Sequence, residues 1–162
     1  MTDSALLELY TDTVRPEWID YNGHMNVAYY VLAFDFATDA FLDYIGLTRD
    51  FKETANSTTF ALDMNVSYKR EVVEGDPLRF TTQMIDADQK RLHFFHQMFH
   101  GEDGYLAATN EVLSVHVNLN TRRVAPMPDT LWRRVETLRA EHRTLATPDA
   151  IGRNMGIRRN SG

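Results

Sequence analysis

The hydrophobic positions of this chain follow two periods, and the period changes once along the sequence. Between residues 26 and 45, apolar side chains recur at spacings of three, four and seven, which places them on one face of an α-helix. These residues are Val27, Tyr30, Val31, Phe34, Phe41, Leu42 and Ile45. Asn26 suits the N-cap because its side chain accepts from free N–H groups of the first turn. Gly46 suits the end, so we predict a long, largely buried helix over 26–45.

From residue 60 onward the period is two, which is typical of strands that bury one face. The alternation covers residues 60–69, 78–84 and 113–120, whereas residues 91–100 carry bulky side chains at both odd and even positions. Turn-forming residues at 74–77, 86–90 and 100–105 separate these segments. We therefore predict four long strands in an antiparallel meander, preceded by a first strand over 9–18.

A second helix is predicted near the end of the chain, over about 130–145, and we expect the last dozen residues to be loose. We divide the chain into a sheet-and-helix unit over 1–128 and a C-terminal helix and tail over 129–162. The fold class is α+β, because a single apolar helix precedes a run of strands.

Composition narrows the class of protein. The chain has 162 residues, 43% of them hydrophobic, and no cysteine. The absence of cysteine excludes disulfides, zinc–thiolate sites and cysteine nucleophiles. The N-terminal stretch MTDSALLELYTD lacks the basic region of a signal peptide, and no apolar run approaches the roughly 18 residues of a membrane span. We expect a cytoplasmic protein without a membrane partner.

Charge is unevenly distributed. Residues 122–162 hold nine arginines and four acidic residues, a net +5, and residues 1–121 hold eight basic and nineteen acidic residues, a net −11. An acidic body argues against nucleic acid as a partner. The basic tail is expected to be a solvated, frayed end, with one arginine on a phosphate as the alternative.

The polar loop before the long helix carries the candidate chemistry. Helix N-termini bear free N–H groups and about half a positive charge, so they stabilise an anion. Asp20 supplies a carboxylate that can act as nucleophile or general base, and Gly23 allows a tight turn or close approach of a ligand. His24 and Asn26 can hold the loop in place. A carboxylate beside backbone donors suits thioester hydrolysis, although polar residues before a helix are also common caps.

The same residues resemble a known family. The stretch DYNGHMNVAYY matches the D-x-x-G-H-x-N-x-x-x-Y pattern of hotdog-fold acyl-CoA thioesterases of the 4-hydroxybenzoyl-CoA thioesterase type. The resemblance covers about residues 8–121. It implies a five-stranded antiparallel sheet wrapped around one central helix, and a homodimer with the active site at the subunit interface, with a homotetramer left open. It also implies that Asp20 is the catalytic carboxylate and that the amides near Val27 polarise the thioester carbonyl.

Within that family, residues 16–47 look most like betainyl-CoA thioesterases of bacterial carnitine catabolism. This resemblance implies hydrolysis of betainyl-CoA to glycine betaine and CoA. Aromatic faces bind a trimethylammonium group well. Trp18 and Tyr21 flank Asp20 and are the preferred cage candidates. Tyr30 and Gly23 are further candidates for substrate contact, although a place in the core is the preferred interpretation for Tyr30 and Phe34. No cofactor is expected, since CoA is part of the acyl-CoA substrate.

Other interpretations remain open from the sequence. A broad medium-chain or aryl acyl-CoA thioesterase, a hotdog hydratase or dehydratase, and a non-catalytic acyl-CoA or betaine binding module all fit the fold. We expect no metal site, because His93 and His96 point to opposite faces if residues 91–100 form a strand. No phosphate-binding glycine loop is present, so basic side chains must hold the CoA phosphates. The candidates are Lys69, Arg70, Arg91, Arg122 and Arg123.

Overall fold

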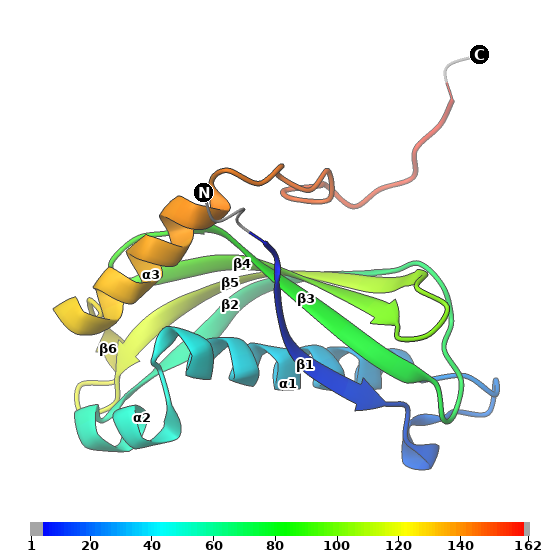
Figure 1. Cartoon of the computed structure of the whole chain (residues 1–162), viewed down its shortest axis with the longest axis horizontal. Helices are drawn as coiled ribbons and strands as arrows, with labels where there is room; N and C mark the ends of the chain where they lie inside the picture. The colour runs from blue at the N-terminus through cyan, green and yellow to red at the C-terminus, as the bar shows by residue number, and fades with distance from the viewer. Residues whose placement is uncertain (1–4, 161–162) are drawn as a thin grey trace.

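A curled antiparallel sheet wraps around one long helix (Figure 1). The structure is a computed structural model that describes residues 5–160. The strands are β1 (Leu7–Thr13), β2 (Ser57–Tyr68), β3 (Pro77–Ala87), β4 (Arg91–His100), β5 (Leu106–Asn118) and the short β6 (Arg123–Val124). The helices are α1 (Val27–Ile45), α2 (Arg49–Ala55) and α3 (Asp129–His142), with a 3-10 turn at Pro16–Trp18.

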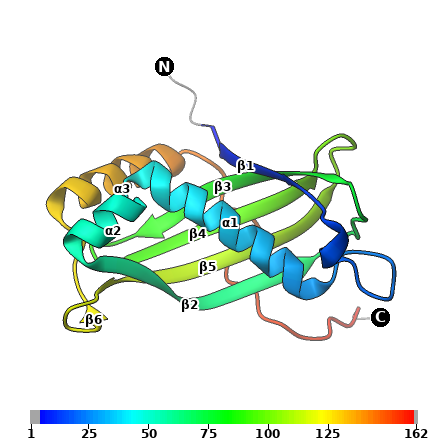
Figure 2. The same cartoon turned by 90° about the horizontal axis from the view of Figure 1, so that it is seen from below.

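The strand order is β1-β3-β4-β5-β2, with β6 paired to β5, and every pairing is antiparallel. The predicted four-strand meander is wrong in one respect. β3, β4 and β5 form a meander, but β2 pairs with β5 at the far edge instead of with β3. Sequence periodicity predicts strands, whereas it does not specify which strands are neighbours. The wrapped arrangement implied by the family resemblance is confirmed, with α1 lying along the concave face (Figure 2).

The caps of α1 follow the prediction. Asn26 Oδ1 accepts from the Ala28 N–H at 2.9 Å, and Gly46 ends the helix in the left-handed region at φ 101°. The buried face is shifted from the predicted one, because Val27 is 57% exposed and Val31 is half-buried. Ala33 and Ala37 are buried instead, and their small side chains let the helix approach the sheet closely.

Two local predictions need correction near the ends of elements. The first strand ends at Thr13 and gives way to the 3-10 turn, since proline at position 16 lacks the N–H that a strand ladder uses. Helix α2 was not predicted. Its N-cap is Thr48, whose side chain accepts from the Phe51 N–H at 3.2 Å, and it buries no residue fully. A seven-residue helix with so small an apolar face gives little periodic signal.

Strand β2 is an open edge of the sheet, and its apolar side chains are more exposed than predicted, except for Val66, which is half-buried against the core. Exposed fractions are 47% for Phe60, 59% for Leu62, 42% for Met64 and 46% for Tyr68. The register shifts between Ala61 and its neighbour two residues on, which marks a bulge at Leu62. The period-two alternation is present, but within residues 5–160 no strand pairs with this edge, and Arg153 contacts it only near its end, at Asn65 and the Val66 carbonyl.

The chain after α3 contacts the convex face of the sheet at Gly152 and Arg153, whereas residues 154–160 are exposed and lead away from the sheet, in line with the predicted loose end (Figure 1). Gly152 N–H donates to both oxygens of the Glu111 carboxylate, at 2.9 and 3.2 Å. Arg153 Nη2 donates to Asn65 Oδ1 at 2.9 Å. Helix α3 itself is confirmed, and Val135 is fully buried in the cluster that contains Phe41. Within residues 5–160, no helix combines the length and hydropathy that crossing a membrane requires.

Candidate active site

The loop before α1 is held by backbone pairs at its base. Ile19 and Met25 form an isolated antiparallel bridge, and the Met25 N–H donates to the Val72 carbonyl at 2.9 Å. The Asn26 N–H donates to the Trp18 carbonyl at 2.9 Å. At the tip, Gly23 has φ 82°, a conformation that side-chain-bearing residues rarely adopt, and a Cβ there would meet nothing within 4 Å. The glycine therefore serves the turn and leaves its surroundings open.

Asp20 is fixed by two hydrogen bonds, one to each carboxylate oxygen. Oδ1 accepts from the Asn22 N–H at 2.8 Å, and Oδ2 accepts from Asn26 Nδ2 at 3.2 Å. The residue is half-buried. Because Asn26 Oδ1 also caps α1, one amide side chain joins the carboxylate to the start of the helix. The carboxylate is thus oriented, yet it keeps access to solvent and to a ligand.

The first turn of α1 retains one open donor. The Ala28 N–H is bonded to Asn26 Oδ1 and the Tyr29 N–H to the Asn26 carbonyl, at 2.9 and 3.0 Å. The Val27 N–H has no such acceptor among the described residues, and its side chain is exposed. An open N–H at the positive end of a helix is suited to an oxygen that gains negative charge.

The histidine of the motif faces away from the carboxylate. His24 Nδ1 lies 3.3 Å from the Met25 carbonyl oxygen, and Nε2 lies 3.8 Å from Glu71 Oε2. These contacts tie the loop to the segment after β2. Asn26, and not His24, is therefore the motif side chain that contacts Asp20.

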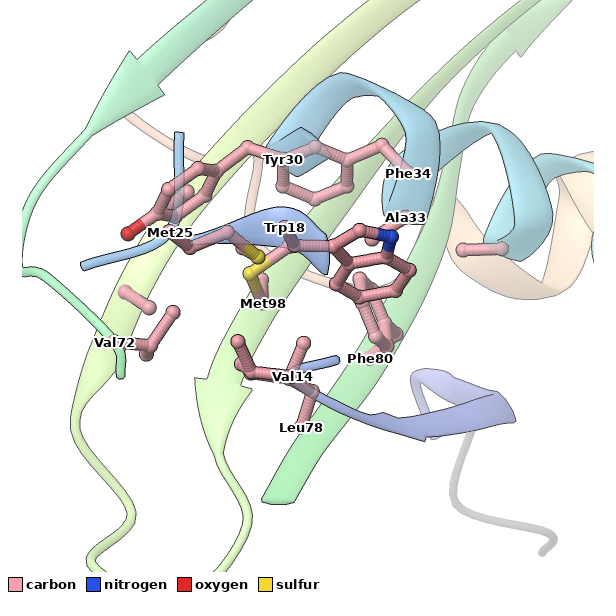
Figure 3. Packing of buried hydrophobic residues seen from close by; sticks show 13 residues of the cluster. Val14, Trp18, Met25, Tyr30, Ala33, Phe34, Val72, Leu78, Phe80 and Met98 are labelled. Atoms are coloured by element: carbon pink, nitrogen blue, oxygen red, sulfur yellow. The ribbon is translucent and has the colours of Figure 1, made fainter. Parts of the chain in front are cut away.

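The two preferred cage residues lie in opposite environments. Trp18 is 2% exposed and belongs to the core cluster shown in Figure 3. Its ring stacks on Tyr29 with centroids 6.0 Å apart, and the Arg15 guanidinium lies 4.7 Å from the indole centroid. Tyr21 is 97% exposed. Trp18 is thus already covered by its own chain, whereas Tyr21 projects freely.

A pocket of about 230 Å³ opens between the start of α1 and the end of β2. Tyr30 and Tyr68 form its aromatic side, with ring centroids 5.1 Å apart at an angle of 84°. Tyr30 is 4% exposed, which confirms that much of its ring belongs to the core, and burial raises the pKa of its phenol. Val27 and Glu71 also line this pocket. It is the hollow next to the Asp20 loop, although it is smaller than the roughly 500 Å³ hollow under the C-terminal segment.

The candidate phosphate-binding residues are now separated in space. Lys69 and Arg70 line the pocket beside α1. Arg91 is paired with Asp88 in the β3–β4 turn. Arg123 is the first residue of β6 and Arg122 precedes it, at the opposite end of the sheet from the start of α1 (Figure 1). Only the first two lie close enough to serve a ligand that reaches Asp20.

The histidines of β4 point to opposite faces, as predicted. His93 Nε2 contacts Glu111 Oε2 at 2.7 Å on the convex side. His96 is fully buried beneath α1, with Nδ1 2.8 Å from Thr82 Oγ1 and Nε2 2.9 Å from Thr38 Oγ1. Burial lowers the pKa of His96 from 6.5 to about 3. This imidazole is therefore neutral, and it forms part of the buried core between the sheet and α1.

Sequence reasoning missed Tyr68 and Glu71 as residues of the pocket. Both lie more than 35 positions after the motif, and only the pairing of β2 with β5 brings them to the start of α1. Tyr68 was predicted only as an apolar position of a strand. The phenol hydroxyl of a tyrosine at the end of a predicted strand was the one feature that could have indicated a role, and it is weak evidence.

Comparisons with known proteins agree with this geometry. The family model described as the thioesterase-like superfamily matches residues 14–135. A betainyl-CoA thioesterase of Pseudomonas aeruginosa is 37% identical over 95% of this chain and 97% of its own length. An L-carnitine dehydrogenase/betainyl-CoA thioesterase of Rhizobium meliloti is 30% identical over 96% of this chain, which corresponds to 31% of that longer protein.

Solved structures show the same fold. A hypothetical protein from Staphylococcus aureus, solved in complex with CoA, is 32% identical with a TM-score of 0.90, and the match covers 98% of this chain and 99% of that one. A 1,4-dihydroxy-2-naphthoyl-CoA thioesterase from Synechocystis shares the fold at 17% identity and a TM-score of 0.70, over 80% of this chain and 95% of its own. The chain therefore belongs to the thioesterase-like superfamily and is an acyl-CoA thioesterase of the hotdog fold.

Proposed function

We propose that this thioesterase hydrolyses betainyl-CoA to glycine betaine and CoA, with Asp20 as its catalytic carboxylate. The observation that carries the role of Asp20 is its fixed position at the start of α1, between the Asn22 N–H and the Asn26 amide. The choice of acyl group is supported by the similarity to the Pseudomonas aeruginosa betainyl-CoA thioesterase over nearly the whole chain.

The proposed reaction places the thioester carbonyl between Asp20 and the Val27 N–H. That N–H stabilises negative charge on the carbonyl oxygen as the carbonyl carbon becomes tetrahedral. Asp20 acts by one of two routes. It attacks the carbon, expels the CoA thiolate and leaves an acyl–aspartyl anhydride for water to cleave, or it takes a proton from the water that attacks. Trapping of an acyl–aspartyl intermediate with hydroxylamine would identify the first route.

We assign Lys69 and Arg70 to the phosphates of CoA, because both line the pocket that adjoins the Asp20 loop. The Arg70 guanidinium lies 4.0 Å from the Tyr105 ring centroid, which fixes its position without neutralising its charge. Replacing each with alanine should raise the KM for acyl-CoA and leave kcat largely unchanged. Arg122→Ala, at the far end of the sheet, is the matched control and should alter neither constant.

We propose that two copies of the chain associate along β2, as a homodimer. An unpaired edge strand exposes N–H and C=O groups that a second strand can satisfy. Phe60, Leu62 and Met64 add apolar side chains on this edge, each more than 40% exposed. Because β2 ends at Tyr68, beside the start of α1, such a dimer would bring the second copy next to the proposed active site.

The test of the catalytic role compares the wild-type protein with Asp20→Asn on betainyl-CoA. We expect Asp20→Asn to lose at least a hundredfold in kcat and to retain CoA binding by calorimetry, because the amide is neither nucleophile nor base. The cysteine-free chain adds no thiol of its own to a thiol-release assay. An Asp20→Asn protein as active as the wild type would remove this mechanism. Ligand binding without any thiol release by the wild type would indicate a binding module.

A further inference from the structure

Tyr68 is the last residue of β2 and stands at the mouth of the pocket beside α1. Its phenol O–H donates to the Val27 carbonyl at 3.1 Å, and its ring meets the Tyr30 ring at 84°. The side chain is nevertheless 46% exposed. The two contacts fix the orientation of the ring, while part of its aromatic surface stays open to a ligand in the pocket.

A trimethylammonium group has no N–H, so hydrogen-bond acceptors cannot recognise it in the way they recognise an ammonium. Aromatic faces attract such a cation through the ring quadrupole. Burial raises the pKa of Tyr68 above its ordinary value of 10, so the ring attracts as a neutral phenol near neutral pH. Glu71 lines the same pocket, and its Oε2 lies 3.8 Å from His24 Nε2, so its carboxylate places negative charge beside the loop before α1. Lys69 and Arg70, which also line the pocket, are assigned above to the CoA phosphates.

The separation between the reacting carbonyl and the quaternary nitrogen of the substrate also favours Tyr68. In betainyl-CoA, one methylene separates the thioester carbonyl from the quaternary nitrogen. Tyr68 is hydrogen-bonded to Val27, the residue whose N–H we assign to the carbonyl oxygen. The Tyr68 phenol and a thioester oxygen at the Val27 N–H therefore contact the same residue in the first turn of α1. Trp18, in contrast, has its ring covered by Tyr29 and Arg15.

We propose that Tyr68 is a specificity-determining residue whose ring face receives the trimethylammonium group of betainyl-CoA. The proposal rests on the proposed function. It assigns recognition of the charged acyl group to the end of β2, and it leaves catalysis to Asp20.

The test uses two substrates of the same shape: betainyl-CoA and 3,3-dimethylbutanoyl-CoA, in which a carbon replaces the charged nitrogen. The quantity measured is the ratio of their kcat/KM values. We expect the wild type to prefer betainyl-CoA and Tyr68→Phe to keep that preference, because the aromatic face remains. Tyr68→Leu should reduce the preference about tenfold or more, with a smaller effect on the neutral substrate. Tyr44→Leu, an exposed tyrosine near the other end of α1, is the matched control.

Incorporating phenylalanine with increasing fluorination at position 68 provides a second measurement in proteins of nearly unchanged shape. The preference should fall stepwise as fluorine weakens the ring quadrupole. An unchanged preference in Tyr68→Leu, or no trend with fluorination, would overturn the role of Tyr68 while leaving the proposed function intact. Hydrolysis of the neutral substrate but not of betainyl-CoA by the wild type would overturn both.

Discussion

Asn26 has two roles that a single substitution can separate. Its Oδ1 caps α1 and its Nδ2 donates to Asp20 Oδ2 at 3.2 Å. Asn26→Asp keeps a good N-cap, and a carboxylate at a helix N-terminus contributes about 0.3–1 kcal/mol of its own. This gain is opposed by repulsion from Asp20 in the folded chain, because the donor to Asp20 is replaced by a like charge. The free energy of unfolding should therefore fall at neutral pH and recover at acidic pH.

The magnitude follows from the distance. Two unit charges 3.2 Å apart repel by about 1 kcal/mol in water and by about 5 kcal/mol at an effective dielectric constant of 20. Since the site is half-buried, we expect the acidic limb of the pH–rate profile to move up by about one to two pH units. Activity should therefore fall most at the acidic end of the pH range and recover as the pH rises.

The assay is kcat/KM for acyl-CoA hydrolysis from pH 5 to pH 9, with urea unfolding of the same proteins. Asn26→Ser is the matched control, because serine also caps a helix but adds no charge. It also removes the donor to Asp20, so it should lower activity and move the acidic limb in the same direction as Asn26→Asp, but by less, because no like charge is added. An Asn26→Asp protein with the wild-type pH profile would refute the coupling of Asn26 to Asp20.

Three further predictions concern stability and assembly. The pKa of His96 is about 3 in the folded chain and 6.5 in the unfolded chain, so its contribution to stability is full above pH 6.5 and is lost as the pH falls. Urea unfolding should show a loss of about 3 kcal/mol in the free energy of unfolding by pH 4.5. A His96→Gln protein should lose correspondingly less. Glu111→Gln weakens the contact with Gly152, so limited proteolysis should cut the C-terminal segment faster while thiol release is unchanged. Leu62→Glu introduces charge on the β2 edge and should shift the sedimentation coefficient toward that of a monomer, whereas Arg49→Glu on α2 should not.

Local features of the fold were predictable because neighbouring residues determine them. The 3.6-residue period, Asn26 and Gly46 defined α1 to within a residue, and alternation located the long strands. The pairing of β2 with β5 was not predictable, because periodicity carries no information about which edge a strand joins. For the same reason the sequence could not show that the apolar side chains of β2 lie open in the described chain.

The same difference between local and long-range contacts applies to the candidate site. Asp20 and Asn26 are close in sequence, and their contact could be expected from the motif. The burial of Trp18 depends on the packing of the 3-10 turn against α1, and the presence of Tyr68 at the pocket depends on the end of β2. Contacts between distant segments decide which aromatic rings are exposed, and sequence proximity to Asp20 does not show that Trp18 is buried while Tyr21 and Tyr68 are exposed.

The most direct test of the central claim is thiol release by the wild-type protein from four substrates: betainyl-CoA, acetyl-CoA, octanoyl-CoA and 4-hydroxybenzoyl-CoA. We predict the highest kcat/KM for betainyl-CoA, with loss of that activity in Asp20→Asn. Comparable activity on the uncharged substrates would be consistent with a thioesterase and would contradict specific recognition of the ammonium group. The absence of thiol release from all four would contradict the proposed function.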